Sequence, residues 1–274
     1  MAAIATRAAT AAPAHPSATL AASTLGIAKR SLLKFLRTPQ LVVLGTIQGA
    51  MFLVIFRYVF GGAIRATGLS YVDFLVPGFI TTGVLFSGMY AATGVAEDLE
   101  QGFVDRLRSL PIPRSAVLAG RALADTAMQL WSLIVTTAIC FAVSFRIHGS
   151  VSDALAAFGL LVVFGFAFEW LFIAIGLVAG NAQAAQGFGV LVFPLTFVSS
   201  AYVPVATMPA WLRVVAEHQP VTMMADAVRA LTQGQAATAT LGHGAGFYVV
   251  RSLVWAAGIV AVFAPLAVAR FRRG

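Results

Sequence analysis

The sequence predicts an all-α integral membrane protein with six transmembrane helices. Hydrophobic residues make up 59% of the 274 residues and charged residues only 10%, whereas about a quarter of the residues in soluble domains are charged. A soluble domain of this size could not bury so much apolar surface, because its ratio of surface to volume is too high. The charged residues also gather in short stretches, separated by long stretches without any Asp, Glu, Lys or Arg.

The uncharged stretches set the positions of the predicted spans. A spanning helix needs about 20 mostly apolar residues at about 1.5 Å rise per residue. Most of the uncharged stretches fit one span, and the stretch between Glu169 and Arg213 fits the end of one span and a whole further one. We therefore place the spans at about 40–60, 74–96, 124–145, 155–179, 187–204 and 247–269.

The N-terminal region divides into two segments. Residues 1–23 are rich in Ala, Thr, Ser and Pro and lack the continuous apolar core of a signal peptide, which indicates a disordered tail. In residues 24–38, Arg30, Lys34 and Arg37 follow each other at helical spacing and share one face. This pattern predicts an amphipathic helix that lies in the membrane interface and contacts anionic lipid headgroups. The alternative is an ordinary positively charged flank of the first span.

The positions of Lys and Arg predict the orientation. Most of them lie in the N-terminal segment, in the second loop and at the C-terminus, which six spans would place on one side of the membrane. Positively charged loops favour the cytoplasmic side, so both termini are expected in the cytoplasm. The net charge of +8 is thereby assigned to topology and lipid contact, and no nucleic-acid partner is expected.

Two connections are longer than simple turns. The external connection, at about 205–235, contains two amphipathic segments bounded by helix breakers, at 209–220 and 221–234. Pro194 interrupts the short fifth span, which suggests a segment that re-enters the membrane from outside. A plain short span with an external cap is the alternative.

The cytoplasmic connection predicts a short amphipathic helix at about 97–112. Leu99, Phe103, Leu107 and Leu110 form one apolar stripe at helical spacing, and Pro111 ends the helix. Such a helix, dense in charges of both signs, is typical of a segment that docks in a groove of another protein. A solvated helix on the membrane surface is the alternative.

This connection resembles that of type 2 ABC transporter permeases, and most closely their daunorubicin-resistance-like exporter branch. The matching residues are Glu97 to Phe103, Asp105 to Leu118, Gly120-Arg121 and Ala124-Asp125. A second match includes Pro204, Met208-Pro209, Trp211-Leu212, His218 to Thr222 and Asp226 to Leu231. Gln219-Pro220 stands where many members of the family have Asn-Pro. The resemblance covers roughly residues 24–272.

The resemblance implies a fold and a division of labour. Residues 39–272 would form a six-span permease domain that pairs with a second permease, identical or related, in a bacterial plasma membrane. Two separate ABC ATPase subunits would bind ATP and Mg²⁺, and this chain would bind no cofactor. The sequence indeed contains no G-x-x-x-x-G-K-[ST] phosphate loop. The residues assigned to ATPase coupling are Glu97, Asp98, Leu99, Glu100, Gly102, Phe103, Arg106, Leu107, Arg108, Leu110, Pro111 and Arg114.

Three residues in the spans are candidates for a substrate path: Glu169, Phe86 and Gln48. A charge such as that of Glu169 costs about 2.5–3.5 kcal/mol at the centre of a spanning helix, so it should face protein or water, or be protonated. Contact with a cationic substrate is one interpretation. The other is a hydrogen bond between helices, with Gln48, Gln129 or an opposing subunit as partner.

The sequence favours a transporter subunit over an enzyme. The four histidines are scattered without metal-ligand spacing to the single Cys140, and we predict no catalytic or metal site. The expected function is export of an amphipathic drug or antibiotic, with a lipid, a lipid-linked glycan or a polysaccharide as alternative substrates. An ion-driven secondary transporter is a further alternative, but it would be expected to show inverted repeats and several carboxylates within the membrane.

Overall fold

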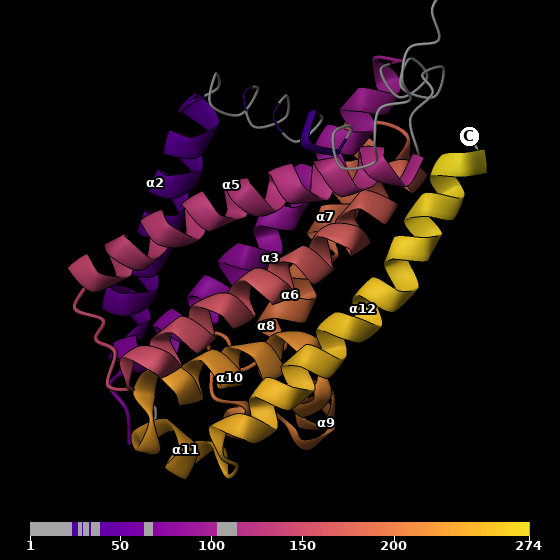
Figure 1. Cartoon of the computed structure of the whole chain (residues 1–274). Coiled ribbons are helices and arrows are strands. Elements are labelled where there is room, and N and C mark those ends of the chain that lie inside the picture. The colour runs from indigo at the N-terminus through magenta and orange to yellow at the C-terminus, as the bar shows by residue number, and fades with distance from the viewer. Residues whose placement is uncertain are drawn as a thin grey trace, which may run out of the picture.

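The computed structural model of the chain describes residues 24–26, 29, 33, 39–62, 68–102 and 114–273, apart from the side chains of 39–46, 114–116 and 272–273. Within these ranges the fold is helical, and no strand occurs in them. The predicted tail at 1–23 and most of the predicted interfacial helix at 24–38 lie outside the described residues. The longer helices cross the bundle from one end to the other (Figure 1).

The elements follow in chain order. The first helices are α2 (Pro39–Ile55), the π-helix η1 (Phe56–Phe60), α3 (Tyr71–Glu100), α5 (Arg114–Ala142) and α6 (Val151–Ala179). The rest are α7 (Ala182–Val190), α8 (Val192–Phe197), the 3-10 helix η2 (Val205–Thr207), α9 (Ala210–His218), α10 (Pro220–Gln233), α11 (Gln235–Leu241) and α12 (Ala245–Arg273).

Four helices in the described ranges are long and apolar enough to cross a membrane. They are α3, α6, residues Val117–Ala142 of α5 and residues Ala245–Phe271 of α12. The predicted first and fifth spans correspond to shorter apolar segments, Ile47–Phe60 and Ala182–Phe197. Helix length therefore supports a polytopic membrane protein and leaves the predicted count of six spans untested.

Local signals explain where the two most buried long helices begin and end. The Ser70 hydroxyl caps α3 by accepting a hydrogen bond from the Asp73 amide at 3.1 Å. Ser150 and Asp153 cap each other's backbone amides at the start of α6, in a capping box. At its other end, α6 stops at Gly180, whose φ of 73° is readily adopted by glycine.

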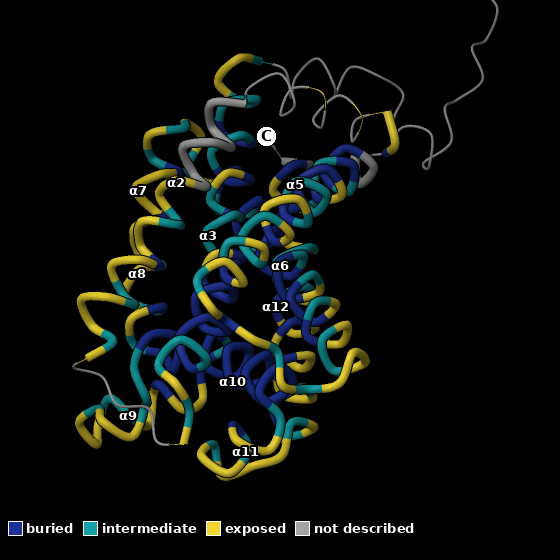
Figure 2. The backbone as a smooth tube through the Cα atoms, turned by 90° about the vertical axis from the view of Figure 1, so that its left-hand side faces the viewer, coloured by how far each residue is buried: buried dark blue, intermediate teal, exposed yellow. Residues whose placement is uncertain are grey.

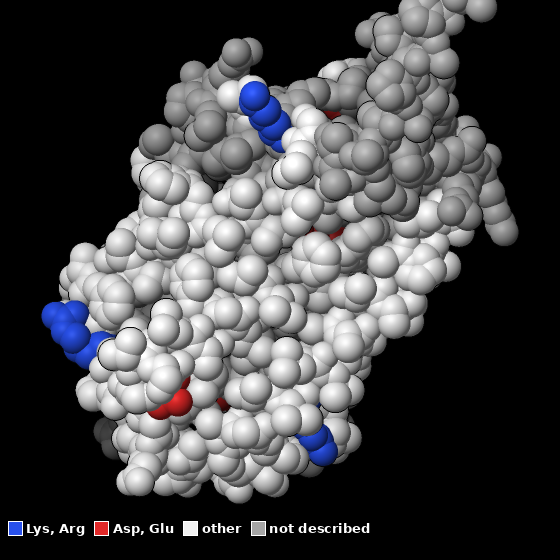
Figure 3. Space-filling model, in the orientation of Figure 1, with Lys and Arg blue, Asp and Glu red and all other residues white. Residues whose placement is uncertain are grey.

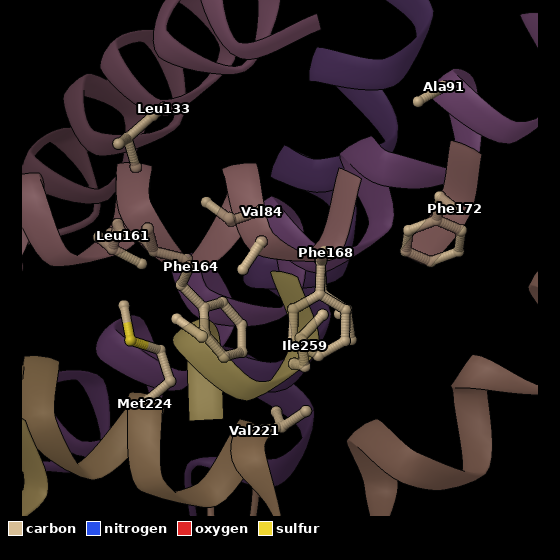
Figure 4. Packing of buried hydrophobic residues seen from close by; sticks show 14 of the residues in the cluster. Val84, Ala91, Leu133, Leu161, Phe164, Phe168, Phe172, Val221, Met224 and Ile259 are labelled. Atoms are coloured by element: carbon tan, nitrogen blue, oxygen red, sulfur yellow. The ribbon is translucent and has the colours of Figure 1, made fainter. Parts of the chain in front are cut away.

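The helices α6 and α10 lie at the centre of the packing. α6 packs against α3 and α12, and α10 packs against α3, α6 and α12. Figure 4 shows Phe164 and Phe168 of α6 beside Val221 and Met224 of α10 and Ile259 of α12. This core lies between the α9–α11 end of the bundle and its opposite end, which we call the Glu100 end (Figure 1).

The two predicted external helices are present as α9 and α10, but α10 is not a surface element. Every residue from Val221 to Gln233 is buried, and the α10 tube is dark throughout in Figure 2. The neighbouring α9 and α11 are largely exposed (Figure 2).

The face of the molecule seen in Figure 3 is mostly uncharged, with the coloured Lys and Arg atoms near its margins. Large apolar side chains are exposed on α5 and α12, including Trp131, Ile134, Val254 and Leu266. An apolar surface of this extent is unfavourable in water and suits contact with lipid.

Candidate functional site: the junction of α3, α5 and α6

The predicted coupling segment begins as the last turn of α3 and not as a separate helix. Glu97, Asp98, Leu99 and Glu100 continue α3, and the chain then turns at Gln101–Gly102. The Gly102 amide donates to the Leu99 carbonyl at 3.0 Å, and the φ of 64° at Gly102 favours glycine. The apolar stripe from Leu99 to Leu110 is therefore not carried by one uninterrupted helix.

The described coupling residues differ in exposure. Leu99 packs against the hydrophobic core, while Glu97 and Asp98 are partly buried and Glu100 is exposed. Arg114 begins α5, but its side chain is not among those described. The other predicted coupling residues lie outside the described residues: Phe103, Arg106, Leu107, Arg108, Leu110 and Pro111.

Arg121 joins the end of α3 to the start of α5. Its Nη1 atom lies 2.9 Å from the Asp98 carboxylate, and its Nε atom lies 2.9 Å from the Asp125 carboxylate. The guanidinium is largely buried, with 15% of the side chain exposed. A planar group with five donors can bind two carboxylates at once, which a lysine ammonium does less well.

Gly94 makes room for this arginine. A Cβ atom at position 94 would lie 2.0 Å from the Arg121 Nη2 atom. Any larger residue there would displace the guanidinium, so the ion pairs depend on a glycine one turn before Asp98.

Glu169 lies close to the same group of charges. Its carboxylate accepts a hydrogen bond from the Thr126 hydroxyl at 2.9 Å, and only 2% of the residue is exposed. Asp125 and Arg121 both act on it electrostatically. Of the partners considered for an interhelical hydrogen bond of Glu169, neither Gln48 nor Gln129 bonds it, and Thr126 takes this place.

Gln129 makes a further contact between α5 and α6. Its Nε2 atom donates to the Leu161 carbonyl at 3.2 Å. The side chain lies against Gly165, where a Cβ atom would come within 1.9 Å of it. Arg121, Thr126 and Gln129 thus form a polar row along one face of α5.

The other two candidates for the substrate path lie elsewhere. Gln48 is exposed on α2. Phe86 of α3 is partly buried and packs on Phe193 of α8, with the ring centroids 4.7 Å apart. Among the described residues, no hydrogen bond, ion pair or ring contact joins Glu169 to Gln48 or Phe86.

Sequence reasoning missed a second charged cluster at the α9–α11 end. Arg229 of α10 is fully buried and pairs with Asp226. Its Nη2 atom donates to the Phe74 carbonyl at 2.9 Å and to the Ser200 carbonyl at 2.8 Å. The Ser200 hydroxyl donates to Asp226 at 2.7 Å. The spacing of Asp226 and Arg229, one turn apart on a helix, was the available signal.

Comparison with known proteins places this architecture in a family. The family model described as ABC-2 type transporter matches residues 23–232. The chain is 32% identical over 257 residues to the daunorubicin resistance ABC transporter permease protein DrrB1 of Streptomyces coeruleorubidus, covering 93% of this chain and 88% of that protein.

Two further relatives are more distant. The probable doxorubicin resistance ABC transporter permease protein DrrC of Mycobacterium tuberculosis is 26% identical over 250 residues, covering 90% of this chain and 87% of that protein. The putative transport permease ycf38 of Porphyra purpurea is 28% identical over 212 residues, covering 74% and 71%. With a family match over most of its length and a relative at 32% identity over 93% of it, the chain belongs to the ABC-2 type transporter family.

Proposed function

We propose that this chain is the permease subunit of an ATP-driven exporter that moves an amphipathic drug or antibiotic across the plasma membrane of a bacterium. The observation that carries the proposal is its 32% identity to a permease named for daunorubicin resistance, over 93% of the chain. A second relative is named for doxorubicin resistance. The long apolar helices α3, α5, α6 and α12 are consistent with a membrane path for such a substrate.

In this proposal the membrane domain has six spans. α2 and η1 together form the first, α7 and α8 the fifth, and the four long helices the others. Both termini and the Glu100 end of the bundle then lie on the cytoplasmic side. The helices α9, α10 and α11 lie on the outer side. The C-terminal Arg270, Arg272 and Arg273 favour this orientation, because basic residues are enriched on the cytoplasmic side.

The ATPase belongs to separate subunits, which bind ATP and Mg²⁺. The coupling segment at about 97–112, which begins in the last turn of α3, docks on them, and Leu99, Phe103, Leu107 and Leu110 supply its apolar anchors. Two permease subunits and two ATPase subunits form the working assembly. Closure of the ATPase pair moves the docked segments and switches the permease pair between its facing states.

Reconstitution tests this function. The chain is co-expressed with candidate ABC ATPases, and the purified complex is placed in liposomes. We expect ATP-dependent movement of daunorubicin, measured by its fluorescence, and no movement with an ATPase that lacks its phosphate-loop lysine. ATP-dependent flipping of a fluorescent lipid without drug transport would instead favour a lipid substrate. Transport driven by an ion gradient without any ATPase would refute the proposal.

A further inference from the structure

Two kinds of contact hold α3, α5 and α6 together between the middle of α3 and the Glu100 end. The contact of α3 with α6 is a close apolar fit. A Cβ atom at Gly88 would lie 2.3 Å from the Phe172 ring, and one at Gly176 would lie 2.4 Å from the Ala92 carbonyl oxygen. Surfaces interlocked this closely do not slide past each other without steric overlap, so α3 and α6 are expected to move as one body.

The contact of α5 with this body is partly polar. Only 28% of the most apolar window of α5 is buried, against 67% for α3 and 61% for α6. Arg121 contacts Asp98 of α3, and Thr126 and Gln129 contact α6 through the hydrogen bonds given above. In apolar surroundings such hydrogen bonds hold helices together, and they can exchange partners without a large change in packing.

The charges near Arg121 show why its position matters. Three carboxylates, those of Asp98, Asp125 and Glu169, lie near one guanidinium. Asp98 belongs to α3, Asp125 to α5 and Glu169 to α6. A shift of Arg121 therefore changes the electrostatic energy of all three helices at once, and this energy is large because the groups are mostly buried.

We propose that Arg121 is a positioning residue that converts a displacement of the coupling segment, through its pairing with Asp98, into a movement of α5 relative to α3 and α6. The inference rests on the proposed function, because that function makes the segment the docking site of the ATPase. Arg121 belongs to the helix after the segment and pairs with Asp98 in its first turn, and this polar contact can adjust as α5 shifts against α3. The Thr126–Glu169 hydrogen bond, one turn further along α5, is the next contact to respond.

Two variants test the proposal without removing a charge. Arg121→Lys keeps the positive charge but loses the planar fork that binds two carboxylates. Gly94→Ala keeps every charged group and places a methyl carbon 2.0 Å from the present position of the Arg121 Nη2 atom. The matched controls are Arg251→Lys, at an exposed arginine of α12, and Gly83→Ala, at an exposed glycine of α3 with no atom within 4 Å of the added carbon.

The readouts separate assembly from coupling. We measure the ratio of permease to ATPase in the purified complex, basal ATP hydrolysis in liposomes, and daunorubicin transported per ATP hydrolysed. Arg121→Lys and Gly94→Ala are expected to assemble and hydrolyse ATP like the wild type, while transport per ATP falls about tenfold, as weakening one charged hydrogen bond would allow. The two controls are expected to match the wild type in all three measurements.

Other outcomes would overturn the inference. If Gly94→Ala transports as much daunorubicin per ATP as Gly83→Ala, the position of Arg121 does not matter for the coupling of ATP hydrolysis to transport. If Gly94→Ala prevents assembly, Arg121 serves folding and not transmission. Both outcomes leave the proposed function intact, since that function fails only if the wild-type complex shows no ATP-dependent transport.

Discussion

The buried arginine of α10 offers a sharp test of how the α9–α11 end is held together. In Arg229→Met, a side chain of similar length remains, but the guanidinium and its hydrogen bonds to Asp226, Phe74 and Ser200 are lost. Arg229 is fully buried, and its guanidinium carbon also lies 4.0 Å from the centre of the Phe74 ring. Water cannot readily replace these partners.

The magnitude follows from what the substitution leaves behind. Breaking a buried ion pair by removing one partner costs about 3–5 kcal/mol, because the other charge stays buried and unpaired. The Ser200 hydroxyl still donates to Asp226 at 2.7 Å, which offsets part of this cost. The Phe74 and Ser200 carbonyls each lose a donor, at about 1–3 kcal/mol for a buried group left unsatisfied. Even with this offset, we therefore expect a loss of at least about 4 kcal/mol of unfolding free energy.

The assay is reversible unfolding in mixed micelles, followed by tryptophan fluorescence. The control is Arg251→Met, at an exposed arginine of α12, which should change stability by no more than about 0.5 kcal/mol. Adding Asp226→Asn to Arg229→Met removes the buried charge that has lost its partner. The loss of unfolding free energy in the double variant should therefore be about 1–3 kcal/mol smaller than the sum of the losses in the two single variants. A loss below about 1 kcal/mol in Arg229→Met would refute the reasoning, since it would mean that the buried pair adds little to the fold.

Three further predictions concern other parts of the chain. Phe103→Asp should detach or uncouple the ATPase while leaving membrane insertion intact, measured by co-purification and by membrane fractionation; normal assembly and transport would count against the docking assignment. Glu169→Gln keeps an oxygen that can accept the Thr126 hydrogen bond, so transport of a cationic and of a neutral drug should stay within about twofold of the wild type. A selective loss of the cationic drug would show instead that Glu169 contacts substrate. Gly78→Ala would place a carbon 2.0 Å from the Ala201 carbonyl oxygen and should destabilise the protein by about 1–3 kcal/mol, whereas Gly83→Ala should not; equal stability of the two would contradict the close approach.

The sequence predicts well those elements whose limits are set by local chemistry. Pro209 and Pro220 mark the starts of α9 and α10, and both helices begin within a residue or two of the predicted positions. The first predicted span, at 40–60, coincides with the helical stretch from Pro39 to Phe60. Helix breakers and capping residues act on their neighbours in sequence, so they can be recognised without knowledge of the packing.

The start of α5 illustrates what an uncharged stretch does not show. The stretch predicted a span from about residue 124, and the helix that carries it begins ten residues earlier, at Arg114. Arg121 and Asp125 lie within α5, where the guanidinium pairs with Asp125 and with Asp98 of α3. A charge that is paired within the protein does not end a helix, and the sequence does not reveal the pairing partner on α3.

The burial of α10 was hidden for a related reason. Its polar face suggested exposure to water, but Arg229 and Thr222 find their partners in the protein. These are the Phe74 and Ser200 carbonyls and the Ser200 amide. Backbone groups carry no side-chain signature, so a polar face that they satisfy looks in the sequence like a solvated one.

The two arginine clusters have a joint consequence for α3. Near its start, α3 is held by Arg229 through the Phe74 carbonyl, and near its end by Arg121 through Asp98. Between these points, Gly88 and the Ala92 carbonyl fit closely against α6. A helix held at both ends and along its middle is more easily displaced as a whole than bent. A displacement applied at the Glu100 end should therefore reach α10 through α3 as a rigid-body movement, while α5 takes up the relative motion.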